Sequence, residues 1–153
     1  MLMVKKKRKG VRRMLFLDEL PTFARELAIA IRPGDCICLT GEMGAGKTTF
    51  VRALLQEWGL GNDVPFSSPT FNILNSYNLN GLIVHHIDLY RLNNFNSFAE
   101  LDLIANLEDP RAVTFVEWGN KFAELLPFYS KKVHFEYLRG KTLDRMLEYE
   151  GFN

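Results

Sequence analysis

The stretch Gly41-Glu42-Met43-Gly44-Ala45-Gly46-Lys47-Thr48 decides the fold of this chain. It matches G-x-x-x-x-G-K-[ST], the pattern of a phosphate-binding P-loop. Glycines let the backbone curl so that successive N–H groups point at one phosphate group. In this motif Lys47 would add a positive charge near the β- and γ-phosphates, and the Thr48 hydroxyl can bind Mg²⁺. The helix expected after the loop would direct the positive end of its dipole at the same phosphates.

The segments on both sides of this loop have the character that a P-loop requires. Residues 35–40 are compact and mostly apolar, which predicts a buried strand. Cys36 and Cys38 would share one face of it, where we interpret them as small buried side chains rather than a metal or redox pair. After the loop, apolar residues recur at helical spacing up to Gly59. Strand, glycine loop and helix in this order predict a nucleotide-binding loop.

Length and composition favour one soluble domain. The chain has 153 residues, of which 47% are hydrophobic. No apolar run approaches the roughly 20 residues that a bilayer requires, so we expect a cytoplasmic protein without membrane contact.

The basic residues are unevenly distributed. Seven of the 19 lie in residues 1–13 with no acid among them, which leaves 12 basic against 18 acidic residues in 14–153. We expect residues 1–13 to be a solvated, disordered tail, with RNA contact as the alternative. Residues 14–153 would then form the P-loop domain. Met14 directly follows the basic run and offers a second start for translation.

Periodicity and turn residues outline the remaining elements. Asn80-Gly81 lies between two apolar runs, which is a strong hairpin signal. The pattern predicts helices from an N-cap at Asp18 to residue 31, over 98–107, and over 120–126 with Pro127 as the stop. Strands are expected at 14–17, 71–79, 82–89, 112–116, 132–138 and 145–150, with the last two joined near Arg139-Gly140-Lys141. The predicted fold class is α/β: a single P-loop NTPase-like domain, with a central mixed sheet flanked by helices and with antiparallel hairpins.

Two acids compete for the role of the metal-binding carboxylate that P-loop enzymes place at the end of a neighbouring strand. Glu117 ends the better hydrophobic run, and Asp88 ends the other. Both could reach the nucleotide, because ligands collect at the carboxyl ends of such strands. The alternative for each is a surface acid at a strand end. Of His85 and His86, only one can face the site, and we assign neither a catalytic role.

Several P-loop classes can be tested against the chain. GTPases read guanine with Asn-Lys-x-Asp, but the nearest match here ends in Ala123, which has no carboxylate to pair with guanine. Nucleotide kinases usually carry an arginine-bearing lid, and the arginines here are scattered. The residues alone leave a small Mg²⁺-dependent ATPase or a small-molecule kinase.

Three further motifs follow the P-loop in order. They are Ser68-Pro69-Thr70-Phe71, the run His-Ile-Asp-Leu-Tyr-Arg-Leu over residues 86–92, and Glu117-Trp118. With the P-loop they resemble the TsaE family, the small bacterial ATPases of tRNA threonylcarbamoyladenosine synthesis. The resemblance covers about residues 18 to 127 and is far more specific than the P-loop alone.

The resemblance implies an ATPase that uses ATP and Mg²⁺. Lys47 and Asp88 would be catalytic, and Thr48 and Glu117 would hold the metal ion. Ser68 and Thr70 would lie in a segment likened to a GTPase switch. The residues that would bind the cofactor are Thr22, Glu42, Met43, Gly44, Ala45, Gly46, Lys47, Thr48 and Thr49.

The resemblance also implies partners. Family members support threonylcarbamoyl transfer by the TsaB and TsaD proteins without performing it. Contact with tRNA would therefore be indirect, through that complex. An independent small-molecule kinase remains the alternative function.

Overall fold

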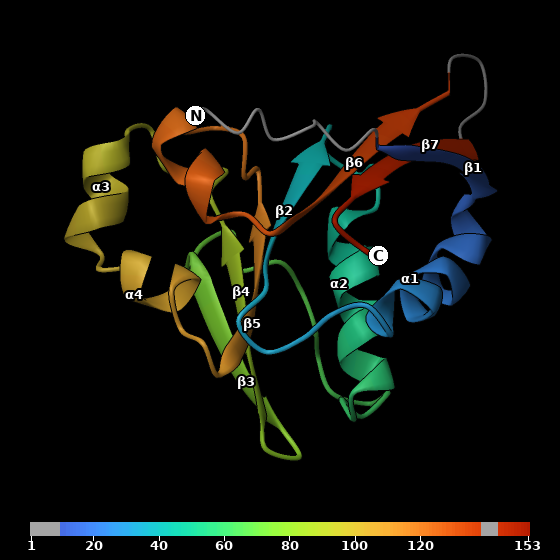
Figure 1. The fold of residues 1–153 in the computed structure, drawn as a ribbon, viewed down its shortest axis with the longest axis horizontal. Helices are drawn as coiled ribbons and strands as arrows, with labels where there is room; N and C mark the ends of the chain where they lie inside the picture. Colours follow the sequence, from blue (N-terminus) through green and yellow to red (C-terminus); the bar gives the residue numbers. More distant parts are fainter. Residues whose placement is uncertain (1–9, 139–143) are drawn as a thin grey trace, which may run out of the picture.

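The computed structural model describes residues 10–138 and 144–153, which form one seven-stranded sheet with helices on both faces (Figure 1). The strands are β1 (Val11–Phe16), β2 (Cys36–Gly41), β3 (Leu74–Leu79), β4 (Leu82–Asp88), β5 (Ala112–Glu117), β6 (Lys131–Tyr137) and β7 (Asp144–Glu150). Their order in the sheet is β1-β7-β6-β2-β5-β4-β3. The P-loop strand β2 is therefore central.

The middle of the sheet is parallel and its margins are antiparallel. β2 pairs in parallel with β5 and β6, and β5 pairs in parallel with β4. The pairs β1–β7, β6–β7 and β3–β4 are antiparallel. The parallel strands all end at one edge, which is where ligands collect in α/β sheets. The predicted mixed sheet, parallel around the P-loop with antiparallel hairpins elsewhere, is confirmed.

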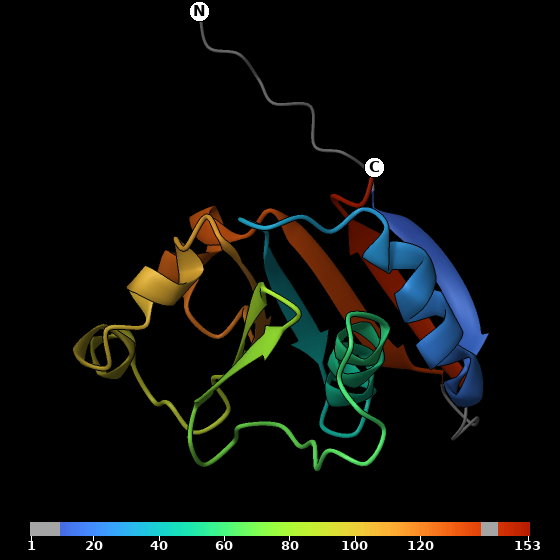
Figure 2. The same cartoon turned by 90° about the horizontal axis from the view of Figure 1, so that it is seen from below.

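Helices cover the two faces of the sheet differently (Figures 1 and 2). Helices α1 (Leu20–Ala28) and α2 (Lys47–Glu57) pack on one face, against a core that includes Ile37 and Leu39 of β2. On the opposite face, Cys36 belongs to a second core under α3 (Phe95–Glu100), α4 (Ile104–Leu107) and the 3-10 helix η2 (Ala123–Phe128). The alternation of side chains along β2 explains how one strand serves both cores. Among the described residues, no helix combines the length and apolar character needed to cross a bilayer.

The two cysteines are buried and free, as predicted for small strand residues. Burial raises the pKa of both Cys36 and Cys38 to about 12. Both thiols therefore stay protonated at neutral pH, where a protonated thiol packs like a small apolar side chain.

Both predicted hairpins are present. Asn80 and Gly81 connect β3 to β4 with φ of 53° and 93°, the positive values that a two-residue hairpin turn requires. β6 and β7 form the second hairpin. Its expected turn at Arg139-Gly140-Lys141 lies outside the described residues.

The N-terminal elements differ from the prediction. β1 begins at Val11 rather than Met14, because the residues from 11 onward pair with β7. Residues 1–9 of the predicted tail lie outside the described residues. Asp18 is not a helix N-cap, since it lies inside a 3-10 helix, η1 (Leu17–Glu19), that precedes α1. The backbone N–H of Phe16 donates instead to the Glu19 carboxylate at 2.8 Å.

Other boundaries move for local reasons. The strand expected at 71–79 starts at Leu74, because the Ile73 N–H donates to the Pro69 carbonyl at 2.6 Å and closes a turn. The helix expected at 98–107 is two short helices, α3 and α4, and Asp102 between them has φ of 55°. Pro127 does not stop the helix expected at 120–126 but lies inside η2.

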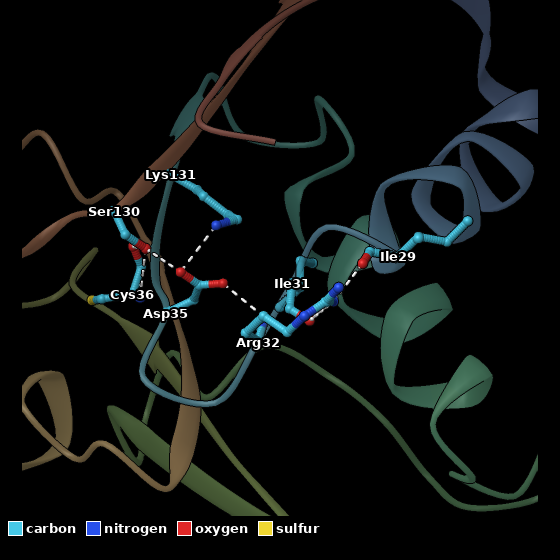
Figure 3. Close-up of polar contacts among 7 residues, drawn as sticks. All are labelled: Ile29, Ile31, Arg32, Asp35, Cys36, Ser130 and Lys131. Atoms are coloured by element: carbon cyan, nitrogen blue, oxygen red, sulfur yellow. Dashed lines mark hydrogen bonds and ion pairs between the residues drawn. The ribbon is translucent and has the colours of Figure 1, made fainter. Parts of the chain in front are cut away.

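A polar cluster anchors β2 at the end opposite the P-loop (Figure 3). The Asp35 carboxylate accepts hydrogen bonds from the Arg32 N–H at 2.8 Å, the Ser130 hydroxyl at 2.8 Å and the Lys131 ammonium at 2.9 Å. Burial raises the pKa of Asp35, but these donors outweigh it and hold the pKa below its usual value. The cluster therefore ties the start of β2 to the start of β6, which fixes the strand that carries the P-loop.

Candidate functional site

The P-loop connects the carboxyl end of β2 to the first turn of α2, and its glycines stand where there is no room for a side chain. Gly41, Gly44 and Gly46 have φ of 135°, 75° and 118°. A Cβ on Gly41 would lie 2.3 Å from the Phe135 carbonyl oxygen, and one on Gly46 would lie 2.7 Å from the Leu20 side chain. Left-handed backbone and close neighbours together explain why the pattern needs glycine at 41 and 46, and why this chain also has glycine at 44.

The Lys47 ammonium is held at the mouth of this loop. It donates to the carbonyl oxygens of Gly41 at 2.6 Å and Glu42 at 2.8 Å, and it lies 4.4 Å from the centre of the Trp118 ring. Burial lowers the pKa of the Lys47 ammonium, whereas the nearby carboxylates of Glu117 and Asp88 favour its charged form. The loop thus holds a cation where the motif places one.

Thr48, Glu117 and His86 form a hydrogen-bonded chain beside the loop. The Thr48 hydroxyl donates to Oε1 of Glu117 at 2.9 Å, and Nε2 of His86 lies 2.8 Å from the same oxygen. Glu117 and His86 are 3% and 0% exposed. Because an oxygen of an ionised carboxylate only accepts, we assign the His86 proton to Nε2. Nδ1 of His86 has no hydrogen-bond partner among the described residues.

Asp88 lies next to Glu117, because the two are paired residues of the parallel strands β4 and β5. Oδ2 of Asp88 accepts hydrogen bonds from the hydroxyls of Ser68 and Thr70, the latter at 2.8 Å. Oδ1 accepts the backbone N–H of Tyr90 at 2.9 Å. Asp88 therefore ties the loop before β3 to the edge of the sheet where β5 ends at Glu117.

These groups line one cavity of about 300 Å³ at the carboxyl edge of the parallel strands. Lys47, Asp88 and Glu117 all reach it, so the two competing acids share a site and neither is an isolated surface acid. The cavity is lined by Leu17, Met43, Gly44, Gly46, Lys47, Thr48, Thr49, Ser68, Thr70, Asp88, Tyr90, Glu117 and Trp118.

Three residues assigned to cofactor binding are not in this lining. Thr22 is exposed on α1, and its contact with the nucleotide stays a prediction. Ala45 is fully buried, and Glu42 is exposed. Both belong to the loop through their backbone, since the Ala45 N–H donates to the Glu42 carbonyl at 3.1 Å.

The structure adds a residue that the sequence analysis set aside. His86 does not line the cavity but lies 2.8 Å from Glu117, which does, whereas His85 is bonded to Ser76 at 2.8 Å on the neighbouring strand β3. The sequence did indicate that His86 lies on the same side as Asp88, because residues two apart on a strand share a face of the sheet. The sequence could not show that His86 would meet Glu117, which lies on another strand.

Comparison with known proteins places the residues of this site in one family. A sequence model of the TsaE family, described as threonylcarbamoyl adenosine biosynthesis protein TsaE, matches residues 17–147. This chain belongs to the TsaE family. The match spans the P-loop, the two acids, His86 and β6, and it ends at Leu147 within β7.

Three TsaE proteins illustrate the likeness, and each is named as a tRNA threonylcarbamoyladenosine biosynthesis protein. The one from Rickettsia bellii is 34% identical over 72% of this chain and 74% of its own. That from Bacillus subtilis is 36% identical over 72% of this chain and 66% of its own. That from Streptomyces coelicolor is 37% identical over 80% of this chain and 82% of its own.

A solved structure agrees in fold. The crystal structure of YdiB from Bacillus subtilis matches with a TM-score of 0.68 and 26% identity. It covers 92% of this chain and 84% of its own. The TsaE-family chain therefore has a P-loop NTPase-like fold.

Proposed function

We propose that this chain binds ATP with Mg²⁺ and hydrolyses ATP in the cytoplasm, in support of the TsaB–TsaD proteins that modify tRNA adenosine with threonylcarbamoyl. The family and the names of the relatives support the pathway. The observation that carries the hydrolytic part is the hydrogen bond from Thr48 to Glu117, beside Lys47 and within the cavity that Asp88 lines.

The donor set fits Mg²⁺. Hydroxyl and carboxylate oxygens are the ligands that this ion prefers, and Thr48 and Glu117 present one of each, 2.9 Å apart. Mg²⁺ bound there would neutralise charge on the phosphates of ATP. The Lys47 ammonium and the loop N–H groups would hold those phosphates, so that water attacks a positioned γ-phosphate.

Asp88 connects the nucleotide site to the loop that contains Ser68 and Thr70. Its Oδ2 holds the hydroxyls of Ser68 and Thr70, so any ATP-dependent change in its contacts acts on their loop. Loops that sense a γ-phosphate are ordered by it and released on hydrolysis. A loop of this kind would present partner proteins with a surface that depends on the bound nucleotide, and tRNA would be contacted through the partners.

A reconstituted tRNA-modification assay tests the proposal. The reactions contain TsaB, TsaD and tRNA, with wild type, with Lys47→Ala or with no added protein. We expect repeated rounds of modification and phosphate release only with wild type, because Lys47→Ala removes the cation at the phosphates. Lys132→Ala, on the opposite face of the sheet and paired with Glu150, is the matched control and should resemble wild type. Equal multi-turnover modification in all reactions would refute the supporting role.

The same reactions separate the proposal from an independent kinase. A kinase would pass the γ-phosphate to an added metabolite without TsaB or TsaD. The proposed ATPase releases it to water, slowly alone and faster with its partners. Following labelled γ-phosphate into free phosphate or into an organic phosphate distinguishes the two.

A further inference from the structure

The outer side of the P-loop is held by the β6–β7 hairpin. The Tyr137 hydroxyl donates to the Met43 carbonyl at 3.1 Å, and Nε of Arg145 donates to the Ala45 carbonyl at 3.1 Å. Arg145 is 3% exposed, and its guanidinium carbon lies 4.0 Å from the centre of the Tyr137 ring. A stacked, buried guanidinium has little freedom, so its donors have fixed directions. The two side chains form one brace, which we call the hairpin brace.

Peptide geometry carries the effect of this brace to the other side of the loop. In a planar trans peptide, the C=O of one residue and the N–H of the next point in opposite directions. Holding the Met43 carbonyl outward therefore turns the Gly44 N–H inward. Holding the Ala45 carbonyl outward turns the Gly46 N–H inward in the same way.

The peptide between these two is fixed from inside the loop. The Ala45 N–H donates to the Glu42 carbonyl at 3.1 Å, so this donor is already used. Nη2 of Arg145 lies 3.5 Å from the Gly44 carbonyl, at the long limit for a hydrogen bond. The brace thus acts on Gly44 and Gly46, two glycines that line the cavity.

We propose that Tyr137 and Arg145 are positioning residues that hold the N–H groups of Gly44 and Gly46 in the direction that binds phosphate. The proposal rests on the nucleotide binding proposed above and extends it to a hairpin without any recognised motif. Close approach supports it, since a Cβ on Gly44 would lie 2.8 Å from the Tyr137 hydroxyl oxygen. Donors oriented before the ligand arrives bind it more tightly, because no rearrangement is needed.

The brace differs from the metal ligands in what its loss should do. N–H groups contact phosphate whether or not Mg²⁺ is present. Removing the brace should therefore lower the affinity for ATP and the affinity for ADP. For each nucleotide the factor should be the same in Mg²⁺ and in EDTA. Glu117→Ala should instead remove only the part of the affinity that depends on Mg²⁺.

The test measures displacement of a fluorescent ADP analogue by ATP and by ADP, in Mg²⁺ and in EDTA. Tyr137→Phe keeps the ring and removes one neutral hydrogen bond, so we expect about a 3- to 10-fold loss of affinity. Arg145→Met removes a charged donor and should cost about 10-fold or more. Tyr149→Phe, on the same hairpin and packed against Phe23 and Phe152, is the control and should bind like wild type.

Two further measurements distinguish a local effect on the loop from a loss of the fold. The unfolding midpoint without nucleotide should fall only slightly in Tyr137→Phe, because the lost bond to the Met43 carbonyl is an exposed one. The amide resonances of Gly44 and Gly46 should shift in this variant. Wild-type affinity in both Tyr137→Phe and Arg145→Met would overturn the inference, as would a loss seen only with Mg²⁺. If wild type itself binds neither ATP nor ADP, the proposed function fails instead, so the two failures are distinct.

Discussion

Replacing His86 by Phe tests how the candidate metal carboxylate is held. His86 lies in β4 with its ring stacked on Phe66, at 5.7 Å between centres and 6° between planes. Phe keeps this packing and removes the Nε2 donor that lies 2.8 Å from Glu117. Nδ1 has no partner among the described residues, so nothing is lost on that side of the ring. The change is therefore close to the deletion of one hydrogen bond.

The size of the effect follows from burial and charge. The side chains of His86 and Glu117 are 0% and 4% exposed, so water cannot replace the lost donor. A hydrogen bond to a charged group contributes about 1.5–3 kcal/mol, which is about 10- to 150-fold in affinity. The Thr48 hydroxyl still holds the same oxygen at 2.9 Å. We therefore expect the lower end, about a tenfold loss of Mg²⁺ affinity in the nucleotide complex, in line with other outer-shell partners of metal ligands.

The assay titrates Mg²⁺ into each protein at a fixed ATP concentration and follows tryptophan fluorescence, to which Trp118 at the cavity and Trp58 at the end of α2 both contribute. A parallel titration in EDTA measures metal-free ATP binding, which should equal that of wild type. His86→Gln retains an amide donor and should recover part of the Mg²⁺ affinity. The matched control is His85→Phe, since His85 bonds Ser76 outside the site.

Two results would refute this reasoning. One is an unchanged Mg²⁺ titration in His86→Phe, which would mean that the hydrogen bond to Glu117 does not orient the carboxylate. The other is an equal loss of ATP affinity with and without Mg²⁺, which would mean that His86 only supports the fold.

Three further predictions concern other groups. Asp88→Asn should bind ATP like wild type and hydrolyse it about 100-fold more slowly, because it keeps the shape and removes the charge; intact steady-state turnover would contradict this. ATP should bind more tightly than GTP in competition titrations, because Ala123 stands where GTPases carry the guanine-reading Asp; equal or tighter GTP binding would be the contrary result. Asp35→Asn should lose about 2 kcal/mol of unfolding free energy at pH 7. The donors around Asp35 lower its folded pKa below the usual 3.8, so this stabilisation is present above pH 3.8 and is lost as the pH falls through the folded pKa. Urea unfolding of both proteins should therefore converge in acid, and a constant difference at every pH would exclude the charge as its cause.

Local patterns predicted the elements best where the residues of one short segment are enough to fix its conformation. The P-loop needs glycine for positive φ within a few residues, and Asn80-Gly81 needs only a tight turn. Boundaries were predicted less well where another element decides them. β1 extends to Val11 because β7 offers a pairing partner, and η1 replaces the expected N-cap because Glu19 reaches back to Phe16.

The candidate site divides in the same way. Alternation along β4 places His86 and Asp88 on one face, which a sequence can show. The meeting of His86 with Glu117 depends on β4 lying beside β5, with Asp88 opposite Glu117. The brace from Tyr137 of β6 and Arg145 of β7 depends on β6 lying between β2 and β7. No periodicity encodes either adjacency.

The sequence by itself determined the P-loop with its strand and helix, and the ordered motifs that contain the two acids and indicate the family, because each of these motifs is written in residues close together in the chain. Only the tertiary structure decided that Glu117 is held by both Thr48 and His86, that Asp88 holds the loop of Ser68, and that the hairpin brace supports the P-loop. Those contacts join residues far apart in the chain, and strand order and register bring them within hydrogen-bonding distance.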